Sequence, residues 1–311
     1  MSNRNDRQRG TALVMAIGVL GIAMALGVVY VTYMQNELES ANYELRKSRA
    51  RAIAEGGVQA TLARLSQAVT AKQPGALLGT PQTIKFPAFE LAFRDGKHEI
   101  QPNSGRTAEA KVSVSDESGK VNLNCAPPAV LQAVLNVNAA TAQKIHATLH
   151  KPGNREWLGS INDLAVRELM PVAQVAALDS STITTVSVAD PAKPEAYLNI
   201  NAAPVDVLAA ILGISKEAAG IVAAKRPFAS VDALLQAAGK PPVDPNAPVA
   251  DSPLAGLVFE PQCFRVASEG SYASNGQGGK KYDRANSRIE AVALFRPDGG
   301  YDVIEWKAVQ Q

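Results

Sequence analysis

The stretch Thr11–Met34 reads TALVMAIGVLGIAMALGVVYVTYM and contains no charged residue. As a helix rising 1.5 Å per residue it is about 36 Å long, which is enough to cross the hydrocarbon core of a bilayer. Arg4, Arg7 and Arg9 precede this stretch, and basic residues beside a span are retained on the cytoplasmic side. The sequence therefore predicts a single-pass membrane anchor with a cytoplasmic amino terminus and an exported remainder.

The apolar stretch is not followed by a break. An ordinary secretory signal has a shorter apolar region that ends at a small-residue cleavage site, whereas here helix-favouring sequence continues as far as Val69. The KQPG tetrapeptide at 72–75 supplies helix breakers, so we expect one helix over residues 11–73. Gly56 and Gly57 lie inside it and mark either a bend or the close approach of another backbone. An apolar stripe at helical spacing surrounds them, formed by Val58, Leu62, Leu65 and Val69.

Residues 1–10 end in RQRG, and TALVM follows. This arrangement resembles the class III leader of type IV pilins and pseudopilins. The resemblance implies that a prepilin peptidase cuts after Gly10 and that Thr11 becomes the new, methylated amino terminus. Family members usually carry Glu at the fifth mature position, where this chain has Met15. From these residues alone, a plain single-pass anchor remains the alternative.

Met15 places an uncharged side chain at a position where the family usually has a carboxylate. A carboxylate in an apolar helix bundle is costly unless it is paired, and in the family it is thought to meet the terminal amine of a neighbouring subunit. A subunit with nothing above it has no such amine to neutralise. Met15 therefore suits a subunit at the top of a filament.

Two stretches read as strands. Residues 74–124 contain short alternating pieces with an Asp-Gly turn at 95–96, and residues 261–311 end in a hairpin whose turn is Pro297–Gly300. We expect them to form a small antiparallel sheet packed on the helix. The predicted fold class is therefore α+β, with a long amino-terminal helix.

Residues 125–260 are rich in Ala, Leu and Val, are punctuated by proline, and predict a large inserted all-α domain. Two stretches repeat, VNLNCAPPAVL from Val121 and LNINAAPVDVL from Leu198. In each, Asn opens a turn, an Ala-Pro pair starts a helix, and a hairpin leads into a second helix. A similar third piece follows each repeat, from Trp157 and from Phe228. The pattern resembles helix-hairpin-helix or SAM-like repeats.

The best-known use of that repeat is binding to the DNA backbone, where glycines in the hairpin let bare N–H groups approach a phosphate. Here the hairpins read Asn136-Val137-Asn138 and Gly213-Ile214-Ser215, so three of four glycine positions are lost. Residues 121–258 carry nine Lys and Arg against eleven Asp and Glu, a formal net charge of −2. DNA binding depends on several basic contacts. We therefore favour a structural repeat and do not expect a nucleic-acid partner.

Few residues point to chemistry. His146 and His150 have the spacing of a shared metal site but no accompanying glutamate or cysteine pattern, so a solvated helix face is favoured. Cys125 and Cys263 bracket the insertion; they pair across its neck or remain two buried thiols. We find no nucleophile elbow, Walker loop or dinucleotide fingerprint, and expect no enzymatic activity and no firmly predicted cofactor.

The whole pattern resembles the K-type minor pseudopilins of type II secretion, in which a helical domain introduced by a segment like Asp116–Leu131 is inserted into the pseudopilin sheet. The resemblance implies a structural subunit at the tip of a periplasmic pseudopilus, anchored in the bacterial inner membrane. It implies other minor pseudopilins, the prepilin peptidase and the secretion platform as partners. Calcium is implied by the same resemblance, with turn chemistry as the alternative, and the candidate ligands are Asp116, Asp244 and Asp251.

Two other functions remain open from the sequence. A minor pilin of a type IV pilus carries the same leader. A membrane-tethered helix-hairpin-helix protein of DNA uptake would combine the anchor with the repeats.

Overall fold

The computed structural model describes residues 3–87, 89–94, 97–102, 106–150, 157–186, 196–243, 252–274 and 284–309. Within these, side chains are described from Val14 onward, except for those of 89–102 and Ser274. The fold is α+β, with a long apolar amino-terminal helix and a sheet that closes in an antiparallel hairpin. This part of the predicted fold class is confirmed.

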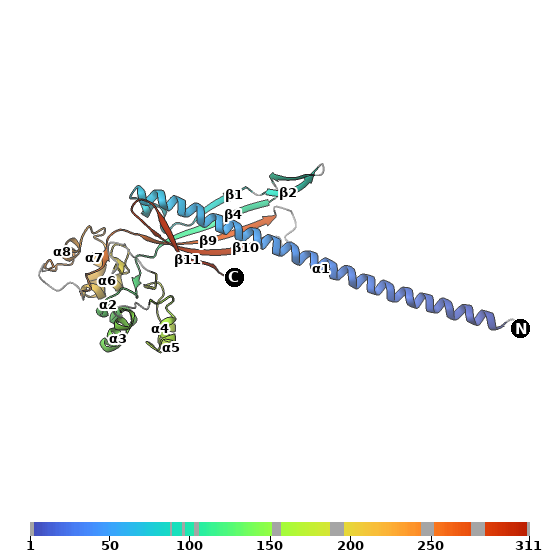
Figure 1. Cartoon of the computed structure of the whole chain (residues 1–311), viewed down its shortest axis with the longest axis horizontal. Helices are drawn as coiled ribbons and strands as arrows, with labels where there is room; N and C mark the ends of the chain where they lie inside the picture. The colour runs from blue at the N-terminus through green and yellow to red at the C-terminus, as the bar shows by residue number, and fades with distance from the viewer. Residues whose placement is uncertain are drawn as a thin grey trace. The chain divides into compact units, whose positions relative to one another are not determined.

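Helix α1 runs without interruption from Asn3 to Thr70 (Figure 1). It begins inside the predicted leader and ends three residues before the expected end. The end is a Schellman motif, because Lys72 adopts a left-handed φ of 56° and the Gln73 N–H reaches the Ala68 carbonyl at 2.8 Å. Among the described residues, α1 is the one helix whose length and composition would let it cross a membrane.

The chain divides into two compact units. The first comprises residues 1–53, 85–109 and 270–287, and the second comprises 54–84, 110–269 and 288–311. These boundaries cut through α1 and several strands.

The first unit contains β2 (Phe89–Arg94) and β3 (Lys97–Pro102), which pair antiparallel from Phe89 opposite Pro102 to Arg94 opposite Lys97. The predicted Asp-Gly turn at 95–96 lies outside the described residues. A small buried cluster joins Ala50 of α1 to Ala108, Tyr272 and Ala285. The Arg49 guanidinium donates to the Tyr272 hydroxyl at 2.9 Å and lies 5.2 Å from the centre of its ring. Arg49 of α1 is therefore engaged within its own unit.

The five-stranded sheet has the order β1-β4-β9-β10-β11. Its strands are β1 (Gln82–Phe86), β4 (Arg106–Asp116), β9 (Cys263–Ser274), β10 (Arg284–Phe295) and β11 (Tyr301–Val309). Strands β10 and β11 pair antiparallel from Arg288 opposite Val309 to Phe295 opposite Tyr301. The turn between them lies at the predicted position, and Gly299 adopts a φ of 85° there. The predicted closing hairpin is confirmed.

In the second unit, α1 packs against the sheet through its carboxyl-terminal part. Val58, Leu62 and Leu65 are fully buried. A Cβ atom added at Gly57 would lie 2.7 Å from Ala110 Cβ and closer still to Ser268 Oγ. Gly57 therefore marks a close approach, made by side chains of the sheet rather than by another backbone.

The residues between β4 and β9 form what we call the duplicated segment (residues 121–259), which builds a hydrophobic core from its own side chains. It is not purely helical, because two parallel strand pairs lie within it: β5 (Val121–Asn122) with β6 (Ile183–Thr184), and β7 (Leu198–Asn199) with β8 (Leu257–Val258). Its helices are α2 (Pro128–Leu135), α3 (Ala139–Leu149), α4 (Asp163–Val166), α5 (Val172–Ala176), α6 (Val205–Leu212), α7 (Lys216–Ala223) and α8 (Val231–Ala237).

Candidate interaction cleft beside the duplicated segment

The two repeats fold in the same way around equivalent asparagines. In the first repeat, the Asn122 side chain accepts the Asn124 N–H at 3.0 Å, and in the second, Asn199 accepts the Asn201 N–H at 3.1 Å. Each thereby fixes a turn directly before a proline-initiated helix. The asparagines that the sequence analysis placed at the start of each turn have this role.

The second asparagine of each repeat holds the piece that follows its helix pair. The Asn124 amide accepts from the Leu158 N–H at 2.7 Å and donates to the Leu158 carbonyl at 3.1 Å. Asn201 makes the same two bonds with Phe228, at 2.7 and 2.9 Å. Each also donates to a returning chain, at the Thr185 and Phe259 carbonyls respectively. The two repeats therefore share equivalent long-range hydrogen bonds as well as similar sequences.

The helix hairpins also correspond. Asn136 and Gly213 both adopt the left-handed conformation after the first helix, with φ of 51° and 58°. Asn138 and Ser215 cap the second helix through their side chains. Asparagine supports the conformation that glycine adopts in the other copy, so the lost glycine does not change the turn.

Glu117 directly follows β4, where the chain leaves the sheet and leads into the duplicated segment. It forms the centre of a charged cluster. Its side chain is 1% exposed. Arg265 donates to both carboxylate oxygens at 3.0 and 3.1 Å, Thr184 donates at 3.0 Å, and the Lys120 ammonium lies 3.2 Å away. Burial acts to raise the pKa of Glu117, but hydrogen bonds and charge from Arg265 and Lys120 outweigh it and hold that pKa below its ordinary value.

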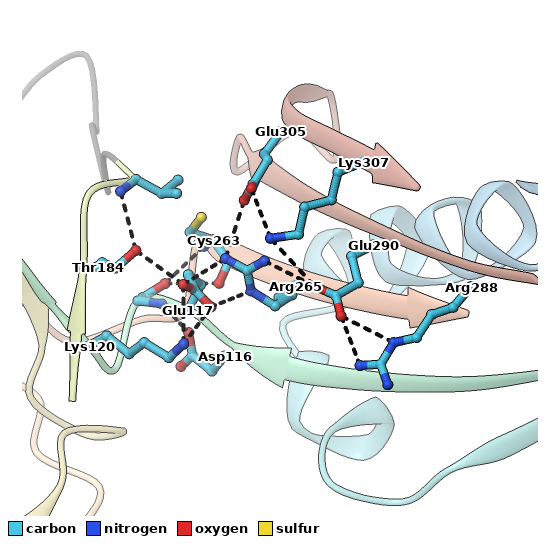
Figure 2. Close-up of polar contacts among 12 residues, drawn as sticks. Asp116, Glu117, Lys120, Thr184, Cys263, Arg265, Arg288, Glu290, Glu305 and Lys307 are labelled. Atoms are coloured by element: carbon cyan, nitrogen blue, oxygen red, sulfur yellow. Dashed lines mark hydrogen bonds and ion pairs between the residues drawn. The ribbon is translucent and has the colours of Figure 1, made fainter. Parts of the chain in front are cut away.

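Arg265 connects this carboxylate to the strands beside it, as Figure 2 shows. It lies on β9 and contacts Glu290 of β10 at 3.5 Å and Glu305 of β11 at 3.3 Å. Lys307 lies 3.2 Å from Glu305 and 3.7 Å from Glu290. Charges of both signs therefore alternate across three neighbouring strands and end at β11.

An open cleft of about 860 Å³ lies between this cluster and the first repeat. The sheet contributes Arg265, Glu290, Ile304, Glu305 and Lys307 to its lining. The duplicated segment contributes apolar and hydroxyl side chains, among them Trp157, Ile161, Ser160, Thr184 and Thr185. This cleft is not predicted by the sequence, because its charged residues are separated by as many as 190 positions, from Glu117 to Lys307.

Of the three calcium candidates, Asp116 alone lies among the described residues. Asp116 is half-buried, and its carboxylate accepts from the Ser118 N–H at 2.8 Å and from the Asn199 amide at 3.3 Å. Burial raises its pKa. Asp244 and Asp251 lie outside the described residues. No group of three or more His, Cys, Asp or Glu side chains suited to a metal ion occurs in the described part of the chain.

Cys125 and Cys263 are both buried thiols, not a disulfide. The Asn122 amide lies 3.8 Å from the Cys125 sulfur, and burial raises the pKa of the Cys263 thiol. Of the two alternatives drawn from the sequence, the structure has the pair of thiols. The ring of His146 on α3 stacks on that of His150, which directly follows the helix, with 4.1 Å between the ring centroids.

The basic residues near the second hairpin contact the duplicated segment itself. Lys216 lies 2.7 Å from Asp206, although both side chains are exposed. Lys225 donates to the Ala237 carbonyl at 2.9 Å, and Arg226 donates to the Ala203 carbonyl at 2.7 Å. Three of the segment's cations are thus engaged in internal contacts.

The residues tied to the leader lie on α1. The backbone of Gly10 and Thr11 lies within the helix, and no side chain before Val14 is described. Met15 is 71% exposed.

No family model matches the sequence, and neither does any curated protein. Among solved structures, the chain is similar to one chain of the GspK–GspI–GspJ complex of the type 2 secretion system from enterotoxigenic Escherichia coli. The two share 14% sequence identity with a TM-score of 0.48, and the match covers 89% of this chain and 99% of that chain.

Proposed function

We propose that the chain is a K-type minor pseudopilin, a structural subunit at the tip of the pseudopilus of a type II secretion system. In this role it has no catalytic activity of its own and supports export of other proteins across the outer membrane. Its partners are other minor pseudopilins, and during assembly the prepilin peptidase and the inner-membrane secretion platform.

The main support for the proposal is that the apolar side chains of α1 are exposed in its amino-terminal part and buried in its carboxyl-terminal part. The large apolar side chains between Val14 and Met34 are about half exposed or more, whereas those of Val58, Leu62 and Leu65 are fully buried against the sheet. One continuous helix thus contains both an apolar span and a part that is buried in a folded body, as a filament subunit needs if it is to be drawn from a membrane. Exposed apolar side chains over this length are stable in lipid and costly in water.

Met15 supports the tip position within this proposal. It places an uncharged side chain where related subunits carry a carboxylate, and so needs no amine from a subunit above. Arg4, Arg7 and Arg9 support an orientation with the folded body in the periplasm.

The duplicated segment, in this proposal, is an inserted domain of two helix-hairpin-helix or SAM-like repeats with a structural role. Its side chains support that role, because Asn124 and Asn201 are used to hold the chain together. The internal contacts of Lys216 and Arg226 leave these cations less available for a phosphate backbone.

The test is intact mass measurement of the membrane-extracted protein, produced with and without a prepilin peptidase. We expect loss of residues 1–10 and one methyl group on Thr11, both abolished by Gly10→Leu. Retention of the leader, or loss of the apolar segment with it, would contradict the proposal. Deletion of the gene should abolish protein secretion and leave pili intact; the opposite result would indicate a pilus subunit.

A further inference from the structure

Trp157 lines the cleft and is 40% exposed, although the repeat forms elsewhere without a tryptophan at this position. Trp157 directly precedes Leu158, the residue that Asn124 holds. In the second repeat the equivalent residue is Phe228, held by Asn201 and preceded by Pro227. Both repeats make the same long-range bonds with different residues before the anchor. The tryptophan is therefore a feature of the first repeat alone, and it gives the cleft a large, flat apolar surface.

The charged side chains of the cleft balance one another. Its lining contains three acids and three bases, namely Glu117, Glu290, Glu305, Lys120, Arg265 and Lys307. Each contacts a side chain of opposite charge within the same set. A charged ligand would have to take a partner from one of these pairs and leave the other member uncompensated, which is costly. The cleft therefore selects a ligand without net charge.

Arg265 keeps hydrogen-bonding capacity despite its ion pairs. A guanidinium has five N–H groups. Nε and Nη2 donate to Glu117, and Nη2 also contacts Glu305, while Nη1 contacts Glu290 at 3.5 Å (Figure 2). These contacts account for four N–H groups. Among the residues that the structure describes, the second N–H of Nη1 has no partner, so Arg265 has one donor left for a ligand.

The loop that carries Trp157 adds donors and acceptors of its own. Ser160 accepts the Asn162 N–H through its hydroxyl oxygen, which leaves the hydroxyl hydrogen to donate. The Asn162 side-chain amide and the Trp157 indole N–H make no hydrogen bond to the described part of the chain. An amide both donates and accepts. The cleft thus combines uncharged polar groups with an exposed aromatic ring.

Hydroxyl groups match such a lining. One hydroxyl both donates and accepts, so it can bond to both members of an ion pair without separating them; Glu305 and Lys307, 3.2 Å apart, are such a pair. The face of an indole ring attracts C–H groups, because the face is negative and the hydrogens are slightly positive. A sugar ring has C–H groups on its face and hydroxyls around its rim. At about 860 Å³ the cleft is within the range of ligand sites, about 300–1,000 Å³.

We propose that this cleft is a binding site for a neutral saccharide, with one sugar ring stacked on Trp157 and hydroxyls bonded to Arg265, Asn162 and the Glu305–Lys307 pair. The site lies within the second compact unit, so it depends neither on the membrane anchor nor on the proposed role in secretion. A neutral peptide is the competing ligand. It fits less well, because a peptide N–H only donates and a peptide C=O only accepts, so neither can serve both members of an ion pair.

The test is isothermal titration calorimetry of the full-length chain in a detergent that carries no sugar. The probes are maltotriose, cellotriose and triacetylchitotriose, with an end-blocked tripeptide of alanine and serine as the competing class. We expect at least one trisaccharide to bind saturably with a Kd of about 1 mM or lower, and the tripeptide not to bind. Because the ligand is neutral, the Kd should be the same at low and high salt.

The two tryptophans of the sequence provide matched variants. Trp157→Ala should weaken saccharide binding at least tenfold, and Trp157→Phe, which keeps an aromatic ring, should restore part of it. Trp306→Phe should leave binding unchanged, because Trp306 is similarly exposed but is not part of the lining. In that variant Trp157 is the one tryptophan, so its fluorescence should change with the same Kd.

Four outcomes would overturn the proposal. They are the absence of saturable binding by all three trisaccharides, binding of the tripeptide in their place, equal saccharide binding by Trp157→Ala and the wild type, and loss of binding in Trp306→Phe. Circular dichroism of each variant establishes that a loss of binding is not a loss of the fold.

Discussion

Replacing Gly57 with alanine should undo part of the packing between α1 and the sheet. The new Cβ would lie 2.7 Å from Ala110 Cβ, 3.3 Å from a Val112 methyl group and closer to Ser268 Oγ. The serine side chain can rotate, but Ala110 Cβ is fixed to the backbone of β4. Helix and sheet must therefore separate by about 1 Å to restore an ordinary contact distance.

The two effects of this substitution have opposite signs. Overpacking a filled core costs about 3 kcal/mol at the upper end of its range. Alanine in a helix interior is better than glycine by about 1 kcal/mol. The free energy of unfolding should therefore fall by about 2 kcal/mol.

The assay is urea unfolding of the full-length protein in detergent, followed by circular dichroism. Gly220→Ala is the matched control, because Gly220 also lies inside a helix but has nothing within 4 Å of its added Cβ. It should raise the free energy of unfolding by about 1 kcal/mol. If both variants shift stability in the same direction, the reasoning about the close approach of α1 is wrong.

Three further predictions concern the duplicated segment and its junction. Glu117→Gln should lower the free energy of unfolding by about 3 kcal/mol at neutral pH. Because the folded pKa of Glu117 is depressed, the wild-type advantage should be present at neutral pH and shrink as pH falls through that pKa, which urea titrations over a series of pH values from 7 downward will measure. Asn124→Ala should cost about 3 kcal/mol and Asn201→Ala somewhat less, since Asn124 is the more buried; equal, negligible losses in thermal unfolding would contradict the repeat's hydrogen-bond role. Cys263 should resist iodoacetamide until the protein unfolds, and rapid modification of the native chain would show that its thiol is accessible.

The long helix could be predicted from the sequence because its signals are local. A run without charge, continued by helix-favouring residues, is sufficient for α1 as far as Val69. The end at Thr70 depends on Lys72 in a left-handed conformation, which is uncommon for lysine, and the breakers at 72–75 predict it only to within a few residues.

The repeats could also be recognised from the sequence, but the role of their asparagines could not be fully assigned. The turn made by Asn122 is local and was expected. The bonds from Asn124 to Leu158 join residues 34 positions apart, and no spacing rule specifies such a partner. The same limit applies to Glu117 and Arg265, which are 148 positions apart.

The charged cluster around Arg265 connects the start of the duplicated segment with the lining of the cleft. Glu117 precedes the first repeat, Thr184 returns from it, and both contact each other beside Arg265. Arg265 also contacts Glu305, which borders the cleft at β11. Removing the Glu117 charge would leave Arg265 to its two remaining carboxylates and draw its guanidinium toward Glu290 and Glu305. The ion pair with Glu117 at the start of the duplicated segment and the contact with Glu305 on β11 therefore share one guanidinium, so a change at Glu117 should be measurable at Glu305.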